Sequence, residues 1–377
     1  MTRICLNMIV RNEQAIIERC LLAVAPYIDC YVICDTGSSD ATISTIKRFF
    51  DARGIRGVIP TIKFQNFEQA RNEALDAARS SSMEFDYLLF CDADMEFKAD
   101  DPDFKSRLTS PVYSMMQRNS DSLVEYFNPR LVHRRIKSQY RGVTHEYLDV
   151  DGATKDRLSG VWYLDYAVGA NRINKYERDI RLLSEALSTD QNNARSVFYL
   201  AQSYRDAKMP EKALLAYDKR AEMTGFDEET FCALLEGARL ARQLEHPASE
   251  VIERFLKAYE FRPSRAESLG DLARYLGEGK KRWAEAYHFA EKAIQIPPPN
   301  DILFVELEWY RWRCLDDYAV AAYWIGEYQK SLSANEKLLA RNDLSNKDRA
   351  RIMSNANFAR SHIPAAPGTT KAPLKYW

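Results

Sequence analysis

Apolar and polar positions alternate in two different ways along this chain. Over about the first 165 residues, short apolar runs typical of strands are separated by helical patterns. The strand-like runs are ICLNMIV (4–10), YVICD (31–35), GVIPTIKF (57–64) and YLLFCDAD (87–94). Helices are expected after Asn12, from about Asp40, and after Asn66, which together with Gln69 resembles a capping box. Pro60 makes the third run an irregular or edge strand. This alternation predicts a mostly parallel α/β sheet covered by helices, and such sheets bind ligands at the carboxyl ends of their strands.

Beyond Tyr176 the strand signals stop and a helical repeat pattern begins. Small and aromatic residues in segment 198–223 match offsets of the tetratricopeptide pattern: Leu200, Ala201, Tyr204, Ala213 and Tyr217. Weaker echoes occur in 283–299 and 318–340, and four helix pairs would fit into 177–345. Repeats of this kind stack and present a concave binding face, so we expect them to bind a protein or peptide. The alternative is that they only support the first domain or form a homodimer contact.

The change of period predicts three parts of the chain. An α/β domain is expected over 1–170 and an all-α, tetratricopeptide-like repeat domain over 171–345. The last part, 346–377, is expected to be a helix end followed by a Pro- and Ala-rich tail that is loosely ordered after Arg360. A length of 377 residues suits about two domains.

Charge, cysteine content and hydropathy narrow the function classes. The formal net charge is −1, which disfavours a dedicated nucleic-acid binder without excluding nucleic acid as a substrate. The seven cysteines are an odd number and form no CxxC pair, so we expect buried thiols in a reducing compartment rather than disulfides or a zinc site. No apolar run reaches the roughly 18 residues of a spanning helix. The N-terminus has no signal-peptide pattern, and we therefore expect a cytoplasmic protein.

The sequence Asp92-Ala93-Asp94 at the end of an apolar run carries the strongest candidate chemistry. Two carboxylates separated by one residue can share a hard divalent cation, whose coordination shell a diphosphate completes. Such a metal stabilises the charge on a leaving diphosphate. The alternative is a solvated acidic turn, because this short pattern is common.

Several further segments give the chain a family resemblance. They are IVRNE (9–13), CDTGSSD (34–40), NFEQARNEAL (66–75), CDAD (91–94) and GVTHE (142–146). In this order and spacing, the first half resembles the family-2 glycosyltransferases, which have a GT-A (Rossmann-like) fold. The second half resembles the repeat region attached to a bacterial and viral subset of these enzymes, and the matches cover residues 3–358.

The resemblance implies a nucleotide-sugar donor, with a UDP-sugar favoured. The residues implied to bind it are Val10, Arg11, Glu13, Asp35, Arg71, Asn72, Asp92 and Ala93. The resemblance also implies that Asp94 and His145 ligate Mn²⁺ or Mg²⁺. Glu146 is then the candidate general base, which would deprotonate an acceptor hydroxyl and give inversion at the anomeric carbon. The resemblance leaves the donor sugar open, and the acceptor could be a protein, a saccharide or a modified nucleic-acid base.

Each of these residues also has a simpler interpretation. Asp35 could cap a helix, Arg71 could lie on a helix surface, and His145 and Glu146 could be structural or solvated. Asp165 stands near a position at which relatives tend to have histidine, so its role is open.

Two other function classes compete with the glycosyltransferase. A nucleotidyltransferase also uses a strand-end acidic pair, but the chain has no Gly-rich or Lys-bearing phosphate loop near its N-terminus. The motifs GxxxxGK[ST] and GxGxxG are absent as well, which argues against P-loop and dinucleotide-binding enzymes. The remaining alternative is a catalytically silent repeat scaffold.

Overall fold

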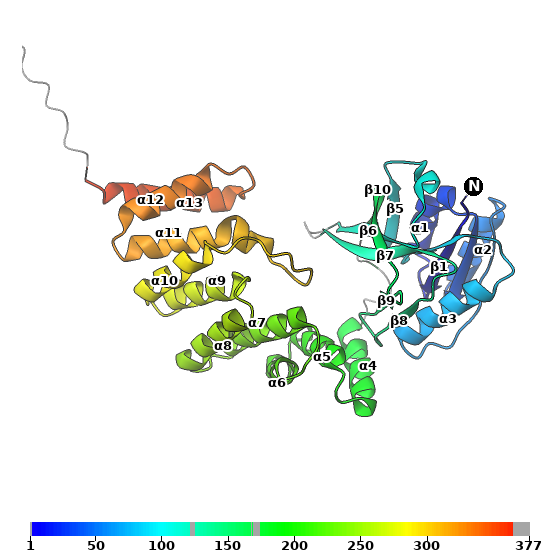
Figure 1. Ribbon diagram of the computed structural model, residues 1–377, viewed down its shortest axis with the longest axis horizontal. Coiled ribbons are helices and arrows are strands. Elements are labelled where there is room, and N and C mark those ends of the chain that lie inside the picture. Colours follow the sequence, from blue (N-terminus) through cyan, green and yellow to red (C-terminus); the bar gives the residue numbers. More distant parts are fainter. Residues whose placement is uncertain (1, 121–124, 167, 169–173, 365–377) are drawn as a thin grey trace, which may run out of the picture. The chain divides into compact units, whose positions relative to one another are not determined.

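The computed structural model describes residues 2–120, 125–166, 168 and 174–364. The chain divides into two compact units, residues 1–203 and 204–377, and each is described by itself (Figure 1). The first unit contains the whole of the first helix that follows the sheet and most of the second helix, up to Ser203. The domain boundary expected after residue 170 lies among residues outside the described ranges and stays a prediction, as does the loosely ordered tail beyond residue 364.

The first unit is built on one eight-stranded mixed sheet with the strand order β3-β2-β1-β4-β7-β6-β10-β5. Its strands are β1 (Ile4–Val10), β2 (Cys30–Asp35), β3 (Arg56–Val58), β4 (Tyr87–Phe90), β5 (Met95–Ala99), β6 (Val112–Asn119), β7 (Glu125–His133) and β10 (Lys155–Asp165). A separate antiparallel pair joins β8 (Gln139–Arg141) to β9 (Tyr147–Asp149). Strands β3, β2, β1 and β4 are mutually parallel, whereas β7 pairs antiparallel with both β4 and β6. The α/β class is confirmed, and the sheet is mixed, with four parallel and three antiparallel pairings among its described strands.

Helices cover both faces of the parallel half because side chains alternate along its strands. Ile4, Leu6 and Met8 of β1 pack in one core with α1 (Ile17–Val24) and α2 (Thr42–Asp51). The intervening Cys5 lies in a second core with residues of α3 (Phe67–Ser80). Short 3₁₀ turns occur at Ala25–Tyr27 and Phe104–Arg107. The helices therefore hold the strand ends in fixed register.

Two local expectations were wrong. The strand expected over 57–64 is only the three-residue β3, and beyond it the pairing with β2 consists of a single bridge between Asp35 and Thr61. Asn12 does not begin a helix, since it has a left-handed backbone (φ 55°) and its side chain accepts from the Ser39 N–H. The capping box is half confirmed: Asn66 Oδ1 accepts from the Gln69 N–H, but the Gln69 side chain accepts from Gln65.

Helical repeats follow the sheet. The helices are α4 (Lys175–Thr189), α5 (Ala194–Asp206), α6 (Pro210–Ala221), α7 (Asp227–Gln243), α8 (Ala248–Phe261), α9 (Glu267–Arg274), α10 (Trp283–Ala293), α11 (Cys314–Trp324), α12 (Tyr328–Leu339) and α13 (Asn346–Ser361). Two π-helical segments, Tyr275–Gly279 and Trp309–Arg313, follow α9 and precede α11. Within the second unit each helix from α6 to α13 contacts the next one along the chain (Figure 1). No helix in the described ranges is both long and apolar enough to cross a membrane.

A series of ion pairs ties alternate helices of the second unit together. Arg205 pairs with Glu236, Arg239 with Asp271, and Arg274 with Asp317. The last pair of the series joins Arg351 of α13 to Asp316 of α11. In the same unit, Gly270 of α9 lies so close to Trp309 that an added Cβ would be 2.4 Å from the indole ring. The second unit is therefore a stack of closely packed helix pairs in register.

Candidate active site

The polar ends of three neighbouring parallel strands meet at one edge of the sheet. Val10 ends β1, Asp35 ends β2, and Asp92 follows β4 after Cys91. The parallel register places Val10 beside Asp35. Because β1 lies between β2 and β4, both acidic strand ends flank the end of β1.

Asp35 is buried and organises the turn that follows it. Its carboxylate accepts hydrogen bonds from the backbone N–H groups of Gly37 (3.2 Å) and Ser38 (3.0 Å). The Val10 carbonyl accepts from both the N–H and the hydroxyl of Thr36. At the start of helix α2, whose N-cap residue is Ala41, Asp40 accepts from the Thr42 N–H. Asp35 thus fixes the turn beside β1 and does not cap the helix itself.

A network of four charged side chains lies beside the end of β4. Arg71 of α3 donates to Asp92 Oδ1 at 2.7 Å through Nη2 and to Glu146 Oε1 through Nε. Arg130 of β7 contacts the other Asp92 oxygen at 3.2 Å. The Arg71, Arg130 and Glu146 side chains are only 14%, 11% and 12% exposed. The fork of hydrogen-bond donors on arginine suits such bridging, and Arg71 therefore links Asp92 to Glu146, the candidate base.

The arginines control the charge of this network. Burial by itself would raise the pKa of Asp92, but the Arg71 and Arg130 guanidinium groups hold that pKa well below its usual value. Burial likewise opposes the charged form of Arg71, and the Asp92 and Glu146 carboxylates more than compensate, which raises the pKa of Arg71. Burial raises the pKa of the neighbouring Tyr140 to about 12. Asp92 is thus ionised at every physiological pH.

Asp94 is half-buried beyond Ala93, and its carbonyl accepts from the Tyr166 N–H. Asp165, the residue before Tyr166, pairs with Met95 at the end of the β10–β5 ladder and so lies beside Asp94. Burial raises the pKa of Tyr126, and the charges of Asp165, Asp92 and Asp94 add to this rise. Asp165 therefore adds another carboxylate to this end of the sheet.

The described residues do not form a metal site by themselves. No group of three or more His, Cys, Asp or Glu side chains in the described ranges is placed to hold a metal ion. Asp92 is engaged by two arginines, and His145 faces Asp179. A divalent cation therefore does not fit a protein-only ligand set here, and it would need oxygens from a bound diphosphate.

His145 and Glu146 lie on one strained turn. His145 has a left-handed backbone (φ 51°), and its imidazole stacks on Tyr199 of α5 with ring centroids 4.3 Å apart. Its carbonyl accepts from Arg195 Nη2 at 2.9 Å, and its Nε2 is 4.0 Å from Asp179 Oδ2. The turn that carries the candidate base is thus held against α4 and α5.

A small cavity of about 40 Å³ opens beside the end of β1. It is lined by Ile9, Val10, Arg11, Thr36, Phe64, Phe67 and Arg178. The guanidinium carbon of Arg178 lies 4.8 Å from the centre of the Phe67 ring. Arg130, Arg178 and Asp179 were not predicted as site residues, because α4 resembles the beginning of a repeat and Arg130 lies in an ordinary strand.

Two of the residues predicted to bind the donor have structural contacts. Asn72 donates to the Tyr140 carbonyl at 2.9 Å and accepts from its N–H at 2.7 Å, which ties α3 to β8. Glu13 is buried, its N–H donates to Thr42 Oγ1, and its carbonyl accepts from the N–H of Ile17. Both residues stabilise the frame of the site, and their predicted contacts with the donor stay predictions.

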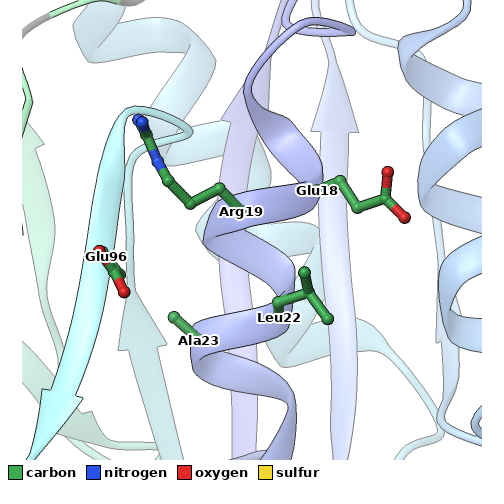
Figure 2. A pocket seen from close by; sticks show the side chains of 5 residues that line it. All are labelled: Glu18, Arg19, Leu22, Ala23 and Glu96. Atoms are coloured by element: carbon green, nitrogen blue, oxygen red, sulfur yellow. The ribbon is translucent and has the colours of Figure 1, made fainter.

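A second, shallow hollow lies away from these residues. Figure 2 shows Glu18, Arg19, Leu22 and Ala23 on α1 and Glu96 on β5, with the Glu18 and Arg19 side chains pointing to opposite sides. The Arg19 guanidinium lies over the Tyr166 ring at 3.8 Å. None of the predicted donor, metal or base residues lines this hollow, so the strand-end network is the better candidate site.

Part of the first unit matches a known protein family. Residues 5–129 match the family described as Glycosyl transferase family 2. This segment is a family-2 glycosyltransferase domain. The match covers β1 to the middle of β7, including Asp35, Arg71 and the Asp92–Asp94 pair. Glu146, Arg178 and Asp179 lie beyond it.

The chain also resembles further known proteins. A TPR repeat-containing protein of Synechococcus elongatus is 28% identical over 155 residues, which are 40% of this chain and 36% of that relative. The chain thus spans about a third of the length of this relative. The crystal structure of MamA protein is 18% identical over 46% of this chain and 91% of that chain, with a TM-score of 0.35. The C-terminal part of a TPR repeat-containing protein from Cytophaga hutchinsonii is 16% identical over 51% of this chain and 72% of that chain, with a TM-score of 0.39. The family match to residues 5–129 and the successive helices that follow the sheet agree with the predicted order of a glycosyltransferase domain and helical repeats. These likenesses say nothing of a partner.

Proposed function

We propose that the protein is an inverting glycosyltransferase that moves a sugar from a nucleotide diphosphate, most simply a UDP-sugar, to an acceptor hydroxyl. The observation that supports this most strongly is the Asp92–Arg71–Glu146 network, in which Arg71 and Asp92 belong to the segment that matches family-2 glycosyltransferases. It joins an ionised carboxylate at the end of β4 to a second carboxylate on the turn at 142–146. A base beside the donor site is the arrangement that direct displacement requires.

The proposed chemistry assigns one proton to Glu146. Its carboxylate would accept the proton of the acceptor hydroxyl while the hydroxyl oxygen attacks the anomeric carbon. The new glycosidic bond forms as the bond between that carbon and the diphosphate breaks, and the nucleoside diphosphate leaves. Arg71 donates a hydrogen bond to Glu146 and so holds its carboxylate in place before the acceptor arrives, and the charge of Arg71 also suits the diphosphate.

The nucleoside would bind beside β1. The cavity between Val10, Arg11 and Phe67 has space for only a few water molecules, so its lining side chains must move apart for a nucleotide. Asp35 lies next to Val10, where a base or ribose could contact its carboxylate. Mn²⁺ or Mg²⁺ remains part of the proposal as an ion bound together with the donor, for which Asp94 would supply one ligand and would help offset the diphosphate charge.

The acceptor is proposed to be a protein or peptide bound at the helical repeats. Stacked helix pairs expose a long surface for this purpose. The seven cysteines are all free and buried, which supports a reducing compartment such as the cytoplasm.

The test is release of sugar from a panel of UDP-sugars by the full-length protein, without added acceptor and with Mn²⁺ or Mg²⁺. We expect hydrolysis by the wild type and a loss of about 10²–10⁴-fold for Glu146→Gln, the range for removal of a general base. Glu84→Gln is the matched control, because Glu84 is exposed and pairs only with Arg3 among the contacts described. Equal rates for Glu146→Gln and Glu84→Gln would overturn the assignment of the base. Absence of both hydrolysis and nucleotide binding in the wild type would favour the scaffold.

A further inference from the structure

A buried carboxylate on α4 lies between the cavity beside β1 and the turn that carries the candidate base. Asp179 is only 1% exposed. A buried ionised carboxylate is costly unless charged or hydrogen-bonding groups compensate for the lost water, so the groups around it indicate its role.

One oxygen of Asp179 fixes a residue of the cavity. Oδ1 accepts from Arg178 Nε at 3.1 Å and from Arg178 Nη2 at 2.9 Å. Arg178 lines the cavity together with Val10 and lies over the Phe67 ring. This two-donor contact restricts the long Arg178 side chain and holds its guanidinium at the cavity.

The other oxygen faces the turn of the base. Asp179 Oδ2 has no hydrogen-bond partner among the described residues, and it is 4.0 Å from His145 Nε2. The stacking of His145 on Tyr199, with ring planes only 7° apart, fixes the plane of the imidazole. A small shift in that plane would complete an Nε2–H···Oδ2 hydrogen bond. A carboxylate in this position selects the Nε2–H tautomer and leaves Nδ1 as an acceptor.

We infer that Asp179 is a positioning residue that orients Arg178 at the nucleotide cavity and His145 beside Glu146. This inference rests on the proposed function, and it extends the site beyond the family-2 segment to α4, the first helix of the repeat region. The simpler alternative is that Asp179 only attaches α4 to the sheet domain.

The effects of Asp179 on Arg178 and on His145 can be separated in the full-length protein by three variants. For Arg178→Ala, we expect UDP binding to weaken about tenfold, with kcat for donor hydrolysis within about twofold of the wild type. For His145→Ala, we expect the reverse, a lower kcat with near-normal UDP affinity. Asp179→Asn should show both defects, each about tenfold, because it weakens both contacts. Glu185→Gln is the matched control on the same helix, since Glu185 is exposed and pairs with Arg181.

A spectroscopic readout tests the inference separately from the proposed function. In ¹⁵N-histidine spectra of the metal-free protein, assigned with His145→Ala, the wild type should show His145 as the Nε2–H tautomer, and Asp179→Asn should shift it to a mixture. If the wild type neither binds UDP nor hydrolyses donor while this shift occurs, the proposed function fails and the contact stands. An unchanged His145 spectrum, or an Asp179→Asn variant that loses only thermal stability, would overturn the inference.

Discussion

Arg71→Ala should destabilise the first unit far more than loss of an ordinary surface arginine. The Arg71 side chain contacts Asp92 at 2.7 Å and also Glu146, and all three side chains are at most 25% exposed. Removing Arg71 leaves two carboxylates close together with one remaining counter-ion, Arg130, which contacts only Asp92 among these three.

The magnitude follows from this geometry. Two unit charges about 4 Å apart attract by about 4 kcal/mol at an effective dielectric constant of about 20. Removing one partner of a buried pair costs about 3–5 kcal/mol, because the other charge stays buried. Since Arg130 still neutralises Asp92 and water reaches part of the network, we expect a loss of about 2–4 kcal/mol in the free energy of unfolding. Glu146→Gln in the same chain should recover about 1–2 kcal/mol of it, the interaction energy of a double-mutant cycle.

Urea unfolding followed by circular dichroism, with the transitions of the two units fitted separately, gives these free energies. Arg107→Ala is the matched control, because the Arg107–Asp101 pair is 45% and 37% exposed and should contribute about 0–1 kcal/mol. If Arg71→Ala and Arg107→Ala have equal effects, or the cycle gives no coupling to Glu146, the network does not have the charge balance described here.

Three further predictions concern stability. Gly270→Ala should lower the free energy of unfolding of the second unit by about 1–3 kcal/mol, measured by urea unfolding, because the new Cβ would overlap the Trp309 ring. An unfolding free energy equal to that of the wild type would contradict this close packing. Burial raises the pKa of Asp317 to about 7 despite its pairing with Arg274. The folded state then holds a proton that the unfolded state releases near pH 4, so stability should fall as pH rises from about 4 to 7, and thermal unfolding of Asp317→Asn should show a shallower slope. Asn72→Ala should lower thermal stability because it removes both hydrogen bonds to Tyr140, and an unchanged melting temperature would contradict this role; isothermal titration of UDP tests the predicted contact with the donor separately.

Local patterns predicted the parallel half of the first unit because its strands and helices lie close in sequence. The runs ending at Val10, Asp35 and Phe90 are strands, and Asp92 follows the last of them. The predicted third strand was too long, since the apolar residues around Pro60 resemble a continuous strand, whereas the structure has only β3 and a single bridge between Asp35 and Thr61.

The rest of the site depends on contacts between residues far apart in the chain. Arg71 meets Glu146 across 75 positions, and His145 meets Tyr199 only when α5 packs against its turn. No periodicity encodes such contacts, so Arg130 and Asp179 had no local signal. The resemblance that indicated Glu146 gave its identity but not its arginine partner.

The measurement that tests the central claim most directly is calorimetric titration of UDP into the full-length protein, with and without Mn²⁺, for the wild type and Asp94→Ala. We expect that Mn²⁺ strengthens UDP binding by the wild type. The affinity of Asp94→Ala for UDP in the presence of Mn²⁺ should equal that of the wild type without the metal. Absence of UDP binding under both conditions, or binding that neither Mn²⁺ nor Asp94→Ala changes, would contradict the assigned donor site.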